Sequence, residues 1–594
     1  MSDYRPPVKD MQFVINELAG LADIAALPGY EEATPDLIEA VLEEAGALCA
    51  EVIAPTNVVG DEQGARVEDG QVRVPAEFHA AYQQYVEGGW PSIVNNPEFG
   101  GQGLPKLIGA AVEEMLQTAN LAWSLCPMLT QGAIHCIEAH GSDELKQIYL
   151  EQMISGAWTG TMNLTEPQAG SDLSVVRSQA VPDGGVYRVS GQKIFITWGD
   201  HDITDNIVHL VLARTPDAPA GVKGLSLFLV PKYLVKGDGS LGEQNSVTTV
   251  SVEHKLGIHG SPTCVLDFQN AEGYLIGELG KGLACMFTMM NSARLGVGLE
   301  GVSISERAYQ LALGWALDRV QGRAPGGKES VAIVEHPDVR RMLLTMKAET
   351  EAMRALAYVA AGHLDHATHA SDAEARAFHQ ARVDLLIPLV KGWITENAQV
   401  LTSLGVQVHG GMGYVEETGA AQHMRDARIL TIYEGTTGIQ AGDLVGRKIL
   451  RDGGAALTTM LDEMDATAAA CKAAGNELTT VCESLTAAVS GAREALAWLL
   501  ANAKADPANA GAVSYHFLML LGLVAGGWQM ARAALIATEK LAAGAADNDF
   551  YAAKILSARF YAEQSLARVS GHAATISSGS ATLMSITVDQ LLGD

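Results

Sequence analysis

Three separate segments of the chain combine carboxylate, hydroxyl and glycine residues in patterns that could do chemistry. They are residues 162–172 (MNLTEPQAGSD), 193–199 (KIFITWG) and 425–440 (RDARILTIYEGTTGIQ). Glu434, which glycine follows at once, has a carboxylate, a group that can accept a proton in general acid–base catalysis. The Ala-Gly-Ser of the first segment could offer backbone N–H groups to a phosphate. Each segment also has an ordinary structural explanation: a capped polar turn, the core of a strand, and a helix N-terminus with a surface glutamate.

The spacing of apolar residues predicts helices toward both ends of the chain and strands between them. Near the start, Thr34 and Pro35 have the types expected for the cap and first position of a helix, whose apolar stripe ends at Pro55. In the middle of the chain the apolar period becomes two. Strands are predicted there at residues 186–198, 206–213, 225–231, 248–254 and 264–268.

These changes of period predict four domains. A helical domain is expected at residues 1–160, a strand-rich domain at 161–278, a second helical domain at 279–452 and an additional alanine-rich helical domain at 453–594. Five or more short strands in one stretch are typical of a small barrel or sandwich. The expected fold class is therefore mostly α with a central β domain.

The composition excludes several classes of function. Lys and Arg total 40 against 69 Asp and Glu, a formal charge of −29, so general nucleic-acid binding is not expected. The seven cysteines are scattered without the spacing of a disulfide framework or a zinc site, and no metal site is predicted. The apolar run at residues 517–528 is shorter than the about 20 residues of a membrane span. Because the first ten residues also lack the apolar region of a secretory signal, we expect a cytoplasmic protein with no membrane span.

Taken together and in this order, the three segments resemble those of the acyl-CoA dehydrogenase family of flavoproteins. Residues 97–101 (PEFGG), 253–261 (EHKLGIHGS) and 407–413 (QVHGGMG) are also similar to the family's P-E-x-x-G-G, K-x-G-x-x-x-S and Q-x-x-G-G-x-G segments. The resemblance implies the family's fold, with an N-terminal helical domain, a central β-barrel and a C-terminal four-helix bundle. It also implies FAD held between barrel and bundle.

The resemblance further implies the reaction, the α,β-dehydrogenation of an acyl-CoA thioester. Glu434 matches the family's base, which removes the α-proton while the β-hydrogen leaves as hydride to flavin N5. Some members place the base at the position that Ala293 occupies here, and alanine has no acid–base group. The backbone N–H of Glu434, with a flavin hydroxyl, is expected to polarise the thioester carbonyl.

The same matching of motifs gives the cofactor positions. Leu164 and Thr165 match residues at the pyrimidine edge of the flavin, and Phe195, Ile196 and Thr197 match those that cover its ring and its other edge. The remaining predicted cofactor-binding positions are Met162, Gly170, Ser171, Arg319, Gln407, Gly410, Gly411, Thr436 and Gly438. Of these, Arg319, Gln407 and the glycines at 410 and 411 match residues that serve the FAD of a neighbouring subunit. Gly438 stands where the family often has glutamine.

Five positions are predicted to contact the acyl-CoA. Arg294 is expected near the base, where it balances the charge, and Asn291 is expected to reach the CoA portion. Ser171 is expected at the flavin pyrophosphate or the pantetheine, and Gly435 is expected to let the acyl chain pass close to the backbone. Tyr433 completes the set.

The extra helical block and the opening residues 4–13 (YRPPVKDMQF) resemble an extended bacterial subgroup of the family. The expected substrate is then 3-methylmercaptopropionyl-CoA, oxidised to methylthioacryloyl-CoA in dimethylsulfoniopropionate degradation. Extended members tend to be dimers, so a homodimer is expected, with an electron-transfer flavoprotein as acceptor. The alternatives are a general short- or medium-chain acyl-CoA dehydrogenase, an acyl-CoA oxidase, a non-catalytic flavoprotein relative and a purely structural helical protein.

Overall fold

The protein, described over residues 4–593 by a computed structural model, divides into two compact units. Unit 1 contains residues 36–296 and the short stretch before Pro7, and unit 2 contains residues 7–35 and 297–594. Residues 1–3 and 594, at the ends of the predicted first and last domains, lie outside the described residues.

The helical part of unit 1 contains the helix that was predicted after Thr34. Helix α3 (Pro35–Leu48) begins with proline and carries Asp36 in its first turn, where a carboxylate interacts favourably with the helix dipole. Its apolar stripe continues through η2 (Cys49–Ile53). The other long helices here are α4 (Thr56–Gln63), α5 (Ala76–Glu87), α6 (Lys106–Ala119), α7 (Leu121–His140) and α8 (Asp143–Ile154).

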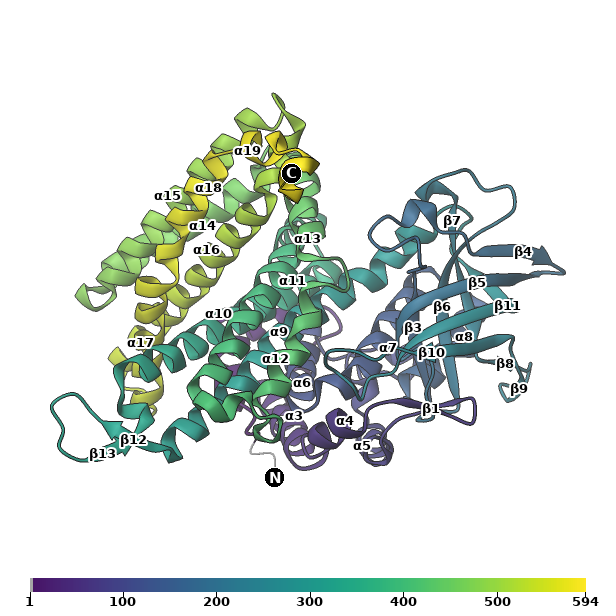
Figure 1. Ribbon diagram of the computed structural model, residues 1–594, viewed down its shortest axis with the longest axis horizontal. Helices are drawn as coiled ribbons and strands as arrows, with labels where there is room; N and C mark the ends of the chain where they lie inside the picture. The colour runs from purple at the N-terminus through teal and green to yellow at the C-terminus, as the bar shows by residue number, and fades with distance from the viewer. Residues whose placement is uncertain (1–3, 594) are drawn as a thin grey trace. The chain divides into compact units, whose positions relative to one another are not determined.

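The rest of unit 1 is built on a seven-stranded sheet. Its strands are β3 (Trp158–Asn163), β4 (Gln179–Asp183), β5 (Val186–Thr197), β6 (Asn206–Arg214), β7 (Leu225–Pro231), β10 (Val247–Val252) and β11 (Thr263–Ile276). β11 pairs with β5, β5 with β4, β4 with β6, β6 with β7, and β7 with β11 again (Figure 1). Because these pairings return to their starting strand, the sheet closes as a barrel, the fold that the family resemblance implied, whereas the strand pattern had left a barrel and a sandwich open.

The five predicted strands are all present, as β5, β6, β7, β10 and β11. β6 and β7 are apolar along nearly their whole length and buried along it, whereas β5 alternates between core and surface. The barrel core includes Ile196, Val211, Phe228, Leu266 and Phe268. β3 and β4 were not predicted, because β3 is mostly Thr, Gly and Asn and β4 contains a proline and an aspartate.

Unit 2 contains the bundle helices. They are the second half of α9 (Gly282–Asp318), α10 (Pro337–His369), α11 (Ala373–His409), α12 (Ala420–Ala427), η10 (Arg428–Thr431), α13 (Thr437–Asp443) and η11 (Leu444–Ile449). The side chain of Asp372 caps α11 by accepting from the N–H of Ala375. The long helices α9, α10 and α11 form the main part of the bundle, and the shorter helices extend it.

The alanine-rich block also belongs to unit 2. Its helices are α14 (Ala455–Ala474), α15 (Thr479–Asn502), α16 (Pro507–Ala542), α17 (Asn548–Gln564), α18 (Val569–Ser577), α19 (Ala581–Ser585) and α20 (Val588–Leu592). α14, α15, α16 and α18 run side by side (Figure 1). Asp506 caps α16, with Pro507 at its first position.

Helix α16 alone among the described helices is long and apolar enough to cross a membrane, and 72% of its most apolar 18-residue window is buried inside the protein. The apolar part of α16 is therefore longer than the apolar run at residues 517–528 that was noted in the sequence. Gly522 explains part of the burial, because a Cβ there would lie 2.1 Å from Cγ of Trp393. The helix therefore packs closely on α11, like a core helix.

The segment at residues 7–35 packs with unit 2, which the sequence pattern did not indicate. It contains α1 (Val8–Phe13), η1 (Val14–Leu18) and α2 (Leu21–Ala25). Arg354 of α10 pairs with Asp10 at 2.6 Å, and Arg532 of α16 donates to the carbonyl of Leu18 at 2.8 Å. Contacts far apart in sequence thus fix the N-terminal segment to the bundle and to the added domain.

The structure also contains three two-stranded hairpins. They are β1 (Arg66–Glu68) with β2 (Gln71–Arg73), β8 (Tyr233–Val235) with β9 (Leu241–Gln244), and β12 (Val320–Arg323) with β13 (Ser330–Ala332). All seven cysteines are buried and free of disulfides.

Candidate active site

The first two predicted segments come together at the end of strand β3 in unit 1. Residues 164–166 leave β3, and Lys193 and Ile194 on β5 lie beside them. Lys193 Nζ donates to the carbonyl oxygen of Leu164 at 3.0 Å, and the N–H of Ile194 donates to the carbonyl oxygen of Thr165 at 2.9 Å. The carbonyls of both predicted flavin residues are therefore bound within the protein, which fixes the orientation of their peptide groups.

A buried ion pair holds this junction. Lys193 and Glu166 are 0% and 3% exposed, and Lys193 Nζ lies 2.8 Å from Glu166 Oε1. The same carboxylate accepts from the N–H groups of Arg177 and Ser178 at 2.7 and 3.0 Å and from the Ser178 hydroxyl at 2.6 Å. Burial raises the pKa of Glu166, but the charge and hydrogen bond of Lys193, with these donors, lower it to about 2. Glu166 is therefore a structural carboxylate, ionised at neutral pH.

Phe195 lies at a β-bulge of strand β5. Opposite β11 the register shifts between the pairs Leu266–Lys193 and Cys264–Ile196, so that β5 has an extra residue there. Phe195 adopts φ 58°, a left-handed conformation that a bulky residue rarely takes, and its side chain is 59% exposed. Bulges of this kind redirect a side chain beside functional sites. The ring is thus held outward on a strained backbone, as a planar ligand would need.

The next two predicted residues differ in where their side chains lie. Ile196 is 2% exposed within the barrel core, so any flavin contact would come from its backbone. Thr197 is half-buried at the end of β5. Trp198 follows, also left-handed at φ 50°, and its indole N–H donates to the carbonyl of Ala122 at 3.0 Å.

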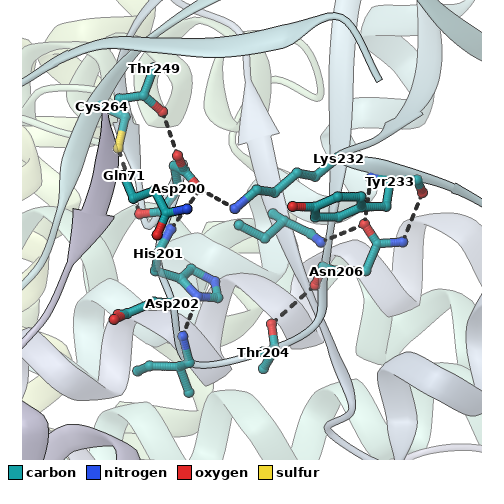
Figure 2. Close-up of polar contacts among 12 residues, drawn as sticks. Gln71, Asp200, His201, Asp202, Thr204, Asn206, Lys232, Tyr233, Thr249 and Cys264 are labelled. Carbon is teal, nitrogen blue, oxygen red and sulfur yellow. Dashed lines mark hydrogen bonds and ion pairs between the residues drawn. The ribbon is translucent and has the colours of Figure 1, made fainter. Parts of the chain in front are cut away.

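Polar contacts anchor the turn after β5 (Figure 2). Asp200 accepts from Lys232 Nζ at 2.6 Å and from the Thr249 hydroxyl at 2.7 Å. The side chain of Asn206 donates to the carbonyl of Tyr233 at 3.0 Å. These contacts fix the backbone just beyond Phe195 and Thr197, so both ends of the strained stretch are held.

The remaining predicted residues of unit 1 lie on β3, in the turn after it and on α9. Met162 is buried on β3, whereas Gly170 and Ser171 are exposed in the turn that follows. A Cβ at Gly170 would meet open space. On α9, Asn291 is exposed and Arg294 is buried.

In unit 2, Glu434 lies in a turn of two successive left-handed residues. Glu434 has φ 55° and Gly435 has φ 89°. Lys391 Nζ, from the fully buried middle of α11, donates to the carbonyl oxygen of Gly435 at 2.7 Å. Gln440 Nε2 donates to the carbonyl oxygens of Glu434 and Gly435 at 3.1 and 3.3 Å. A Cβ at position 435 would lie 2.9 Å from that same nitrogen, so the turn needs glycine there.

Residues on both sides of Glu434 are also held. The Tyr433 hydroxyl donates a short hydrogen bond to Glu300, a fully buried carboxylate on α9. Burial and the neighbouring charge of Glu300 raise the pKa of Tyr433 well above its usual range, so the phenol stays protonated and donates. Thr436 caps α13 by accepting from the N–H of Ile439, and the Thr437 hydroxyl donates to Glu396 at 2.6 Å.

Four other predicted cofactor positions lie at one end of the bundle. Trp315 near the end of α9 stacks on His409 at the end of α11, with ring centroids 5.3 Å apart. Arg319 therefore lies near the glycine-rich turn after α11. The exposed positions here are Arg319, Gln407, Gly410 and Gly411, while Gly438 is exposed on α13. A Cβ at either Gly410 or Gly411 would meet open space, so a ligand could approach this backbone.

The structure adds supporting residues to which the sequence gave no role: Lys193, Glu166, Lys391, Gln440, Glu300 and Glu396. A sequence signal existed for Lys391, which interrupts the continuous apolar run at residues 385–393 (LLIPLVKGW). A lysine in such a run is buried only with a partner. Its partner, the carbonyl of Gly435, is 44 residues away and could not be named from sequence.

Four protein-family models match the chain in order. Three are described as the N-terminal, middle and C-terminal domains of acyl-CoA dehydrogenase and match residues 36–157, 161–271 and 280–450. The fourth, described as acetyl-CoA dehydrogenase C-terminal like, matches residues 460–587. The chain belongs to the acyl-CoA dehydrogenase family.

Individual relatives extend this result over the whole chain. The chain is 50% identical over 588 residues to 3-methylmercaptopropionyl-CoA dehydrogenase of Ruegeria pomeroyi, covering 98% of this chain and 100% of that protein. It is 35% identical over 581 residues to a butyryl-CoA dehydrogenase of Syntrophomonas wolfei, covering 94% of each.

Two solved structures share the fold. Caenorhabditis elegans ACDH-11 in complex with C11-CoA has a TM-score of 0.77 at 22% identity, covering 95% of this chain and 92% of that one. An acyl-CoA dehydrogenase complexed with FAD from Bacillus anthracis has a TM-score of 0.72 at 22% identity, covering 95% and 91%. Both alignments include the added C-terminal helices.

Proposed function

We propose that the protein catalyses the FAD-dependent α,β-dehydrogenation of an acyl-CoA, with 3-methylmercaptopropionyl-CoA as substrate and methylthioacryloyl-CoA as product. The structural observation that carries the reaction is the turn at Glu434, where a carboxylate stands on a left-handed backbone held by buried donors. The substrate rests on the full-length identity of 50% to the Ruegeria pomeroyi enzyme.

Glu434 would remove the α-proton of the thioester. Its backbone N–H would donate to the thioester oxygen and stabilise the enolate that develops as the proton leaves. Both groups belong to one residue, and its φ of 55° sets the direction of the N–H relative to the Cα–Cβ bond from which the carboxylate extends. Gly435, without a side chain, would leave room for the acyl chain beside the backbone.

FAD supplies the oxidant, since it accepts the β-hydrogen as hydride. The residues that would hold it in unit 1 fit a flavin, because Phe195 presents an exposed ring on a strained bulge and Leu164 and Thr165 have fixed peptide groups. Met162, Gly170, Ser171, Ile196 and Thr197 would complete this part of the site. In unit 2, Thr436 and Gly438 would contact the cofactor, and Arg319, Gln407, Gly410 and Gly411 would serve the FAD of a second subunit.

Asn291, Arg294, Ser171 and Tyr433 would contact the acyl-CoA. A sulfur at the γ position of the acyl chain is close in size to a methylene, so a five-carbon acyl chain has nearly the same shape, and butyryl-CoA, one methylene shorter, should compete. One methylene is worth only about 1–3 kcal/mol of discrimination. The 35% identity to a butyryl-CoA dehydrogenase makes a general short-chain activity the second candidate.

We also propose the compartment, the oligomeric state and the electron acceptor of the enzyme. The enzyme would act in the bacterial cytoplasm as a homodimer and pass its electrons to an electron-transfer flavoprotein. The functional division would follow residues 1–160, 161–278, 279–452 and 453–594. The four positions at the α9 and α11 ends support a second subunit, since they are exposed and include a cation beside open glycine backbone.

An anaerobic visible spectrum of the purified protein tests the proposal. 3-Methylmercaptopropionyl-CoA and butyryl-CoA are added in parallel cuvettes. Bleaching of the oxidised flavin, faster with the sulfur-containing substrate, is expected. Faster bleaching with butyryl-CoA would favour the second candidate. A yellow protein that neither ligand bleaches, or a colourless one that cannot be reconstituted with FAD, would overturn the proposal.

A further inference from the structure

Lys391 is a charged group in the interior of unit 2. It is 0% exposed on α11, between apolar neighbours such as Leu389, Val390 and Trp393 that are equally buried. Its ammonium donates to the carbonyl oxygen of Gly435 at 2.7 Å. We infer that Lys391 is a positioning residue for the base, and this inference rests on the proposed role of Glu434.

The turn that carries Glu434 needs external support. Two successive left-handed residues are unusual, and the first is a glutamate, for which this conformation is unfavourable. The peptides after Glu434 and Gly435 are each fixed at their carbonyl oxygen, by Gln440 Nε2 and by Lys391 Nζ. With both carbonyls held, the turn cannot relax to an ordinary right-handed shape without breaking two hydrogen bonds from buried side chains.

Stability alone does not explain a lysine here. A buried ammonium loses its hydration, and a well-packed apolar side chain of similar volume is often as stable or more stable at such a site. Methionine would match the neighbours of Lys391 and would remove that loss. What methionine cannot do is donate to the Gly435 carbonyl, and through this hydrogen bond the ammonium contributes to the shape of the turn.

That shape decides where both reacting groups of Glu434 point. The carboxylate must reach the α-proton while the N–H of the same residue reaches the thioester oxygen, and the backbone angles set the direction of the N–H relative to the Cα–Cβ bond from which the carboxylate extends. Proton transfer needs the reacting atoms within hydrogen-bonding reach, and a misplacement of about 1 Å can lower the rate by about 10²-fold. Lys391 therefore acts on the reaction through the backbone of Glu434.

The test uses Lys391→Met in the FAD-loaded, full-length enzyme. We expect flavin content to be unchanged, KM for the acyl-CoA within about 3-fold, and kcat lower by about 10²-fold. A second readout isolates proton removal: an acyl-CoA analogue with sulfur in place of the β-carbon has an α-proton but no β-hydrogen to transfer. Its deprotonation at the flavin gives a long-wavelength absorption band, which we expect to weaken at fixed pH in the variant.

Lys554→Met is the matched control. Lys554 is also a buried lysine of unit 2, but it pairs with the carboxylates of Asp10 and Glu351 on other elements. Its loss leaves those carboxylates short of a cation, so a lower Tm is expected with kcat within about 3-fold of wild type. The two variants should thus differ in their effects: Lys391→Met should lower turnover, and Lys554→Met should lower stability.

If Lys391→Met does not fold, Gln440→Met keeps the inference testable. Gln440 provides the second buried donor to the turn, and the same inference predicts a kcat loss of about 5- to 10-fold with the absorption band weakened. Unchanged kcat and an unchanged band in whichever of these variants fold would overturn the positioning role. Glu434→Gln separates this result from a failure of the proposed function, because an active Glu434→Gln enzyme would mean that the base is elsewhere.

Discussion

The two units hold their predicted site residues in similar ways. Each places a non-glycine residue in the left-handed region at a predicted site, Phe195 at φ 58° in unit 1 and Glu434 at φ 55° in unit 2. Each also has a fully buried lysine whose ammonium donates to a backbone carbonyl in one of the predicted site segments. Lys193 donates to Leu164 at 3.0 Å, and Lys391 donates to Gly435 at 2.7 Å. In each unit, a buried ammonium thus fixes the backbone of a predicted site segment.

The units differ in what accompanies the lysine. Lys193 pairs with Glu166, whose carboxylate also binds two backbone N–H groups and a hydroxyl. At Lys391 the carbonyls of the turn are shared with the neutral amide of Gln440. In the first arrangement the backbone geometry depends on the Lys193–Glu166 ion pair. Loss of that pair should therefore change the stability of the protein, and the contribution of the pair should depend on pH. The second places a buried donor on the turn that contains Glu434, so its loss should affect turnover first.

The largest effect expected from this comparison is at Glu434, the proposed base. Glu434→Gln should keep the yellow cofactor and lose about 10⁴-fold in kcat, because the amide cannot accept the α-proton. Steady-state turnover and the flavin spectrum of the same preparation measure this. Wild-type turnover would move the base elsewhere, and a colourless protein would mean that Glu434 supports the cofactor instead.

Lys193→Met should be next, and it should affect stability and cofactor together. Glu166 would be left ionised and buried without its cation, which costs about 3–5 kcal/mol. Leu164 would lose its anchor, so FAD should bind more weakly. Thermal unfolding and a fluorescence titration with FAD measure the two effects. The double variant Lys193→Met/Glu166→Leu should regain stability without regaining FAD affinity, and recovery of both would show that the pair does not orient the backbone.

The ion pair also predicts a pH dependence. The pKa of Glu166 is lowered in the folded protein from 4.5 to about 2, so its contribution to stability is full above pH 4.5 and is lost as the pH falls toward 2. The difference in urea midpoint between wild type and Glu166→Gln should therefore shrink over that interval. A difference that stays constant from pH 5 to pH 2 would argue against the lowered pKa.

The smallest effect is expected at Tyr433. Tyr433→Phe removes one donor to the buried carboxylate of Glu300 and should lower the free energy of unfolding by about 1–3 kcal/mol, with kcat reduced less than 5-fold. Chemical denaturation and steady-state kinetics check both values. Tyr515→Phe, at a 40% exposed position on α16, is the control and should change neither. A kcat loss as large as that of Glu434→Gln would make the phenol part of the chemistry.

Local patterns in the sequence predicted much of the fold. The apolar stripe that ends at Pro55 and the alternation at residues 186–198 predicted α3 and β5, because each element buries one face whose spacing is visible in the sequence. β3 was not predicted, since most of its residues are Thr, Gly or Asn and its burial comes from neighbours distant in the chain. The bulge at Phe195 was also not predicted, because it depends on the register with β11.

For the site, the sequence by itself determined which side chains are available: a glutamate before a glycine at 434 and 435, an aromatic ring at 195, and glycine-rich turns. It could do so because residue type and short spacing are local properties. Only the tertiary structure decided how these groups are held. The pairing of Lys391 with Gly435, of Lys193 with Glu166, and of Asp10 with Arg354 joins residues 27 to 344 positions apart. Such pairings depend on which elements pack together, and no local pattern in the chain encodes that choice.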